Sequence, residues 1–141
     1  MASLIEKIDA EKENISVVLA ELRKIDDLSH KSILELNGVG NLLCNVYSGI
    51  ENILKQILNE RGASISKSNS WHSDLLAIAV DNGIITGNTK QQLNKYLGFR
   101  HFYRHAYSFV IKLEKLTPLA KCVFDVYSSF EKEIEIFLKK L

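Results

Sequence analysis

The stretch ILELNGVGNLLCNVYSGIENILKQIL, residues 33–58, decides the fold class. Its apolar residues recur at intervals of three and four, at Ile33, Leu36, Leu43, Val46, Ile50, Leu54 and Ile57. That spacing places them on one face of an amphipathic helix. The motif NGVG interrupts the helix near its start, because Gly38 and Gly40 each cost a helix about 1 kcal/mol relative to alanine. The two glycines indicate either a later helix start or a place where another backbone lies close.

The same periodicity predicts helices before and after this stretch. A first helix is indicated by an apolar stripe at Leu4, Ile8, Ile15, Val18, Leu22 and Ile25. The polar segment RGASISKSNS, residues 61–70, is predicted to be a loop. Ser70 is then the expected N-cap of a short helix from Trp71 to about Val80, which the turn residues DNG close.

Two further long helices are expected in the rest of the chain. One is predicted from about Lys90 to Lys112, after the turn TGNT. The other begins in LTPLAK, with Thr117 as N-cap and Pro118 as the first helical residue. Its predicted buried stripe is Leu119, Cys122, Val126, Phe130, Ile134, Phe137 and Leu141. Long helices joined by short connections predict an all-α, up-and-down four-helix bundle with the Trp71 helix as one additional short helix.

Composition agrees with a single domain over residues 1–141. Apolar residues make up 46% of the chain and charged residues 25%, as in ordinary globular proteins. The formal net charge is +1, so no overall basic field indicates a nucleic-acid partner. No run of about 18 apolar residues indicates a membrane partner, and the first residues lack a signal peptide, so a cytoplasmic location is expected. Cys44 and Cys122 fall on apolar stripes and are predicted to be buried free thiols.

Basic residues are nevertheless concentrated in one part of the sequence. Residues 88–115 contain one acid, Glu114, and six basic residues, which are Lys90, Lys95, Arg100, Arg104, Lys112 and Lys115. With about 100° between successive residues, one arc of the predicted helix carries Tyr96, Arg100, Arg104 and Tyr107. The opposite arc, its predicted core stripe, carries Phe99, Phe102, Ala106, Phe109 and Leu113. Cations interleaved with phenols are suited to phosphates and stacked bases.

His101 and His105 lie between these two arcs. Arg100 and His105 are about 140° apart around an ideal helix and about 7.5 Å apart along it, so a tight contact between them is not expected. They line two edges of a wider cleft, or one site draws on two protomers. Simpler roles stay open: Arg100 pairing with Glu51, structural histidines, and tyrosines that pack between helices. A zinc site is not favoured, because no further Cys/His set or HExxH motif accompanies the two histidines.

The motif RHFYRHAY, residues 100–107, contains Arg-x4-His-x-Tyr. It resembles the signature of HEPN-domain proteins, specifically the HepT-like ribonuclease toxins of prokaryotic toxin–antitoxin pairs. The wider resemblance extends from about residue 34 to the end of the chain. It includes YSGIENILKQI (47–57), SWHSDLL (70–76), YLGFRHFYRHAYSF (96–109) and LEKLTPL (113–119), in the order and spacing of one HepT-like subgroup.

This resemblance implies a homodimeric helical bundle and a metal-independent endoribonuclease that needs no cofactor. It implies that Arg100 and His105 are catalytic, in a cleft that the signature helices of both protomers face. Its implied partners are RNA, such as tRNA or mRNA, and a cognate nucleotidyltransferase antitoxin that AMPylates Tyr107. The sequence departs from the commonest form of the signature in one place, because His101 stands where asparagine usually follows the arginine.

Several other residues are candidates for supporting roles. Phosphate contacts are expected from His101, Arg104, Lys95 and Lys112, and base stacking from Tyr96 and Tyr103, while Glu51 is expected to support Arg100. The alternative function is a non-catalytic HEPN module that binds nucleotide or RNA, or that scaffolds a nucleotidyltransferase. A purely structural helical dimer would leave the basic and aromatic arc without an explanation.

Overall fold

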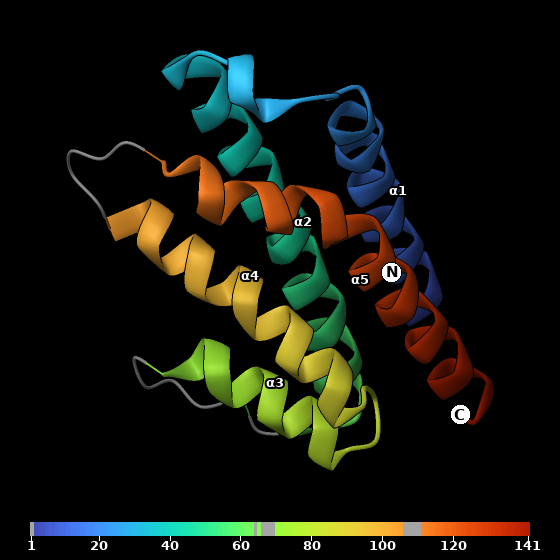
Figure 1. Cartoon of the computed structure of the whole chain (residues 1–141). Coiled ribbons are helices and arrows are strands. Elements are labelled where there is room, and N and C mark those ends of the chain that lie inside the picture. Colours follow the sequence, from blue (N-terminus) through green and yellow to red (C-terminus); the bar gives the residue numbers. More distant parts are fainter. Residues whose placement is uncertain (1, 64, 66–69, 106–110) are drawn as a thin grey trace.

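The computed structural model describes residues 2–63, 65, 70–105 and 111–141, and these residues form helices and their connections without a strand. The elements in order are α1 (Leu4–Arg23), the short 3-10 helix η1 (Leu28–His30), α2 (Ile33–Glu60), α3 (Trp71–Asp81), α4 (Gly87–His105) and α5 (Leu113–Lys139). Helix α2 contacts each of the other four α-helices and is the centre of the bundle (Figure 1). The predicted all-α bundle of four long helices and one short helix is confirmed.

A capping box sets the start of α2. The Ser32 hydroxyl accepts a hydrogen bond from the Glu35 N–H at 3.1 Å, and the Glu35 carboxylate accepts one from the Ser32 N–H at 3.0 Å. These two bonds satisfy donors that a helix start otherwise leaves without partners. Helix α2 therefore begins at Ile33 and runs through NGVG without a break, so the later start considered from the sequence is wrong.

Close packing explains why a glycine stands at position 40 but not why one stands at position 38. A Cβ atom on Gly40 would lie 2.9 Å from Ile111 Cδ1, 2.9 Å from Tyr103 Cε2 and 3.3 Å from Phe99 Cζ. A Cβ atom on Gly38 would meet no atom within 4 Å. Side chains rather than another backbone come close to α2 at this point, and only one of the two glycines is needed for the approach.

Helix α3 lies where it was predicted, although the Ser70 side chain makes no capping hydrogen bond, and α4 begins earlier than predicted. The start of α4 at Gly87, rather than near residue 90, follows from a cap that Thr86 and a carboxylate of another helix form together. The carboxylate of Glu133, on α5, accepts hydrogen bonds from the Thr86 N–H at 2.7 Å and from the Thr89 hydroxyl. The Thr86 hydroxyl also accepts a hydrogen bond from the Thr89 N–H at 3.2 Å.

Helix α5 also begins earlier than predicted, at Leu113, so the predicted start at Thr117 and Pro118 is wrong. Pro118 lies in the second turn of α5, where a proline removes one helical hydrogen bond. The structure describes α4 as far as His105. Leu113 was predicted to belong to the core stripe of that helix but is the first residue of α5.

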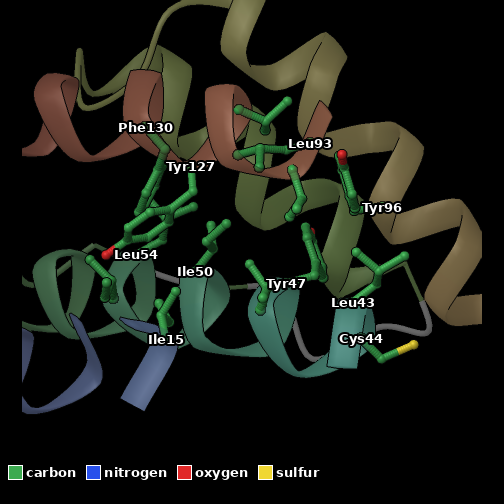
Figure 2. Packing of buried hydrophobic residues seen from close by; sticks show 14 of the residues in the cluster. Ile15, Leu43, Cys44, Tyr47, Ile50, Leu54, Leu93, Tyr96, Tyr127 and Phe130 are labelled. Carbon is green, nitrogen blue, oxygen red and sulfur yellow. The ribbon is translucent and has the colours of Figure 1, made fainter. Parts of the chain in front are cut away.

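The core lies between α2 and the helices around it. Tyr47 of α2, Leu93 of α4 and Phe130 of α5 have at most 1% of their surface exposed, and Figure 2 shows these side chains in one packed cluster. On α5, Val123 and Tyr127 are buried with Val126, whereas Cys122 is exposed and corrects the predicted stripe. Among the described residues, no helix has the length and hydropathy that crossing a membrane requires.

Candidate functional site

Arg100 lies against α2 rather than projecting away from the bundle. Its Nε donates a hydrogen bond to Ser48 Oγ at 3.1 Å, and its Nη1 lies 4.0 Å from Glu51 Oε1. Only 14% of the side chain is exposed. Ser48 and Glu51 are three residues apart and so share one face of α2. The second terminal nitrogen, Nη2, forms no hydrogen bond or ion pair with any residue that the structure describes.

The Glu51 carboxylate connects three helices. Glu51 is 2% exposed, and its Oε2 accepts a hydrogen bond of 2.7 Å from Nδ1 of His72 on α3. Tyr47 lies one turn before Glu51 on α2; burial raises the pKa of its hydroxyl, and the Glu51 carboxylate beside it raises that pKa further. The Tyr47 hydroxyl has no partner at hydrogen-bond geometry among the described residues. Since a buried carboxylate is costly without partners, the fold depends on these contacts.

The two histidines of the signature lie side by side on the outer surface of α4. The ring centroids of His101 and His105 are 4.6 Å apart, and both residues are exposed, as is Arg104. Within the described residues, Arg100 and His105 make no contact with each other, as the helical wheel indicates. Tyr107, together with the predicted stripe residues Ala106 and Phe109, lies outside the described residues.

Two tyrosines that were expected to stack on bases point inward. Tyr96 is 4% exposed, its hydroxyl donates to the Leu119 carbonyl at 2.8 Å, and burial raises its pKa. The prediction for Tyr96 is therefore wrong, because its ring is part of the core. Tyr103 is partly buried, and its hydroxyl donates to the Asn37 carbonyl at 3.0 Å. Phe102, predicted to be in the core, is instead 52% exposed. A phenol can be buried where its hydroxyl finds an acceptor.

The predicted phosphate-binding residues fall into two groups. Lys95 and Lys112 line a cavity of about 670 Å³ between α4 and the start of α5, with the Phe102 ring as one of its walls. Arg100, by contrast, faces α2. The structure therefore brings Arg100 together with Glu51, and His101 together with His105, but places the two lysines at another surface.

Cys44 of α2 lies near two positively charged side chains of α4, Arg100 and Arg104. Burial raises the pKa of its thiol to about 11, although the positive charges of Arg100 and Arg104 act in the opposite direction. The thiol is therefore protonated near neutral pH and is not a nucleophile of the site.

Ser48 and His72 were not predicted as site residues. Ser48 had a detectable signal, since it lies three positions before Glu51 and so on the same helix face. His72 is part of SWHSDLL, but nothing in the sequence pairs it with Glu51, which lies 21 residues away.

Comparison with known proteins agrees with this fold. Residues 38–141 match the family described as HepT-like protein. A similar solved structure is that of the cytosolic protein of unknown function YutE from Bacillus subtilis, with 19% sequence identity and a TM-score of 0.76. The match covers 95% of this chain and 90% of that chain, and at this identity it shows the fold alone. No curated protein matches the sequence. Because the family match spans most of the chain, the protein belongs to the HepT-like family.

Proposed function

We propose that this protein is a metal-independent endoribonuclease toxin whose site is formed by Arg100 and His105 in a cleft shared by two protomers. Membership of the HepT-like family supports a HEPN-type toxin module. The observation that carries the proposal is the guanidinium of Arg100, which Ser48 and Glu51 hold in place on the helix that also presents two exposed histidines. Metal-free cleavage of RNA requires a fixed cation and imidazoles at one phosphate, and in the proposed cleft they come from two protomers.

The proposed chemistry divides between these residue types. Cleavage needs a base for the 2′-hydroxyl proton, an acid for the departing 5′-oxygen, and a cation for the charge on the phosphorus oxygens. Histidine is the usual side chain for proton transfer near neutral pH, so His105 from each protomer takes one of the two proton-transfer roles. Arg100 binds the scissile phosphate and stabilises its charge in the transition state, using Nη2, which forms no hydrogen bond or ion pair with a described residue.

The remaining basic residues bind the rest of the RNA strand. His101 and Arg104 are exposed on α4 and are proposed to contact neighbouring phosphates. Lys95 and Lys112 contact the strand further along, at the cavity that they line.

The test is cleavage of total tRNA and of a generic RNA in the presence of EDTA. The wild-type protein should cut and leave a 2′,3′-cyclic phosphate, and His105→Ala should be slower by about 10²-fold or more. His30→Ala is the matched control, because His30 is an exposed histidine on η1, and it should cut like the wild type. A 3′-hydroxyl product, or loss of cleavage in EDTA, contradicts the proposed mechanism.

We further propose that a partner nucleotidyltransferase silences the enzyme by AMPylating Tyr107. The tyrosine oxygen would attack the α-phosphate of ATP, bind AMP and release pyrophosphate. The added phosphate and nucleoside bring negative charge and bulk to a residue seven positions after Arg100, where they compete with RNA. Tyr107→Phe should escape both modification, measured by mass spectrometry, and silencing. A Tyr107→Phe protein that is still modified and silenced removes this proposal.

A second candidate function is a HEPN module that binds RNA or nucleotide without cutting it. Two observations favour this second function. Little of the Arg100 side chain is exposed, and Arg100 makes no contact with His105 among the described residues. The same cleavage assay separates the two functions. If neither the wild type nor His105→Ala cuts and both bind RNA equally, the surface is a binding site.

A further inference from the structure

The buried carboxylate of Glu51 makes two unequal contacts with basic groups. Its Oε2 accepts the 2.7 Å hydrogen bond from His72, whereas its Oε1 is 4.0 Å from the nearest nitrogen of Arg100. Only 3% of the Glu51 side chain is exposed, so water screens these contacts weakly. The shorter and stronger contact is therefore made by His72, to which the proposed chemistry assigns no role.

The charge of His72 determines how much of the Glu51 charge remains for Arg100. A carboxylate accepts but does not donate, so Nδ1 of His72 carries the bonded hydrogen and Nε2 decides the ring charge. With Nε2 protonated, the imidazolium balances the carboxylate and the charge of Arg100 stays available. Without a proton on Nε2, the His72 ring is neutral. Arg100 alone then neutralises Glu51, and the carboxylate competes with a phosphate for the guanidinium.

The other titratable groups near Glu51 and His72 do not neutralise the Glu51 carboxylate. On α2, burial raises the pKa of Tyr47, so its hydroxyl stays neutral. Also on α2, the Lys55 ammonium lies 4.1 Å from the centre of the Trp71 ring. On α3, Asp74 accepts a hydrogen bond from the Ser70 hydroxyl at 3.1 Å. In the part of the chain that the structure describes, His72 and Arg100 are thus the groups that form ion pairs with Glu51.

We infer that His72 is a positioning residue that, when protonated, holds the Glu51 carboxylate and leaves Arg100 free to bind a phosphate of RNA. This inference rests on the proposed role of Arg100 as the phosphate-binding group. The His72 side chain is 27% exposed, so its ring can exchange protons with solvent while its hydrogen bond to Glu51 remains. The additional short helix α3 then has a function, because it supplies the second cation of a site built on α2 and α4.

The test measures how the binding of a 2′-O-methylated single-stranded RNA depends on salt. The methylated 2′-oxygen cannot attack the phosphate, so the strand stays intact. Each lost phosphate contact reduces the slope of log K against log salt concentration by about 0.7. His72→Gln should lose about this much slope per site and bind more weakly, because its neutral side chain leaves Glu51 to neutralise Arg100. His72→Lys keeps a positive charge, so its slope should exceed that of His72→Gln.

Two further variants separate this role from general destabilisation. Adding Glu51→Gln to His72→Gln should restore the slope, because no carboxylate then remains to hold Arg100. Because removing the buried carboxylate can also restore stability, thermal unfolding of each variant is measured beside the slope, and a slope that follows the melting temperature instead of the charge overturns the inference. His30→Gln, at an exposed histidine on η1, should leave the slope and the affinity unchanged.

Each outcome bears on the inference. An unchanged slope in His72→Gln, or a loss that persists in the double variant, overturns it. If His72→Gln does not fold, His72→Lys decides: as the pH is raised, the slope of the wild type should fall relative to that of His72→Lys, and slopes that change in parallel overturn the inference. If the wild type binds unmethylated RNA without cleaving it, the proposed nuclease activity is wrong, but the proposed role of His72 in phosphate binding remains. A wild type that binds no RNA overturns both.

Discussion

At the scale of single residues, Gly40 and Gly38 should respond oppositely to the same substitution. Gly40→Ala gains helix propensity but places a methyl group 2.9 Å from two side-chain atoms, and such overpacking typically costs about 1–3 kcal/mol. Gly38→Ala gains the propensity, about 1 kcal/mol, without a clash. Urea unfolding should therefore find Gly40→Ala less stable than the wild type and Gly38→Ala more stable. Two variants of equal stability would mean that the contact with α4 is absent in solution.

The two cysteines should differ strongly in reactivity. Cys44 is buried and its thiol pKa is raised to about 11, so at about pH 8 only about one molecule in a thousand carries the reactive thiolate. Cys122 is exposed on α5. Labelling with a thiol reagent followed by mass spectrometry should modify Cys122 first and Cys44 only after unfolding with urea. Equal labelling rates in the folded protein would contradict the burial of Cys44.

At the scale of helices, the start of α4 depends on a side chain from α5. Glu133→Gln replaces a charged acceptor of the Thr86 and Thr89 hydrogen bonds by a neutral amide, which should cost about 1 kcal/mol. The matched control is Glu135→Gln, because Glu135 is exposed and its ion pair with Lys12, at 3.8 Å, is of a kind worth about 0–1 kcal/mol. Thermal unfolding should therefore show the larger loss for Glu133→Gln. Equal losses in both variants would show that the cap does not hold α4.

At the scale of the whole molecule, a site shared by two protomers should allow two inactive variants to complement each other. Arg100→Ala and His105→Ala should each be inactive alone, since each removes one of the two proposed catalytic groups. In mixed dimers, one protomer supplies an arginine and the other supplies one of the two proposed histidines, so an equimolar mixture should cut RNA faster than either variant alone but more slowly than the wild type. Sedimentation measures whether mixed dimers form. Mixed dimers that cut no faster than the single variants would contradict a site that takes its arginine and one histidine from different protomers.

Local features of the sequence were sufficient for the helices and the fold class. The intervals of three and four in residues 33–58 and the family signature act within a few turns of one helix, whereas the equally local capping box of Ser32 and Glu35 was not predicted. The starts of α4 and α5 were misplaced. The cap of α4 combines the local Thr86 hydroxyl with Glu133, which lies 47 residues from Thr86, and α5 runs through a proline that usually marks a first turn.

By itself, the sequence determined that the chain is an all-α bundle of the HepT-like type and that Arg100, His101 and His105 belong to one helix. Only the tertiary structure decided which way the side chains of that helix point. Tyr96 is buried because its hydroxyl reaches the Leu119 carbonyl, 23 residues away. Arg100 turns toward α2 because Ser48, 52 residues away, accepts its hydrogen bond. Helical periodicity reports which residues share a face, but the partners that bury or hold each face come from other helices, which local spacing does not encode.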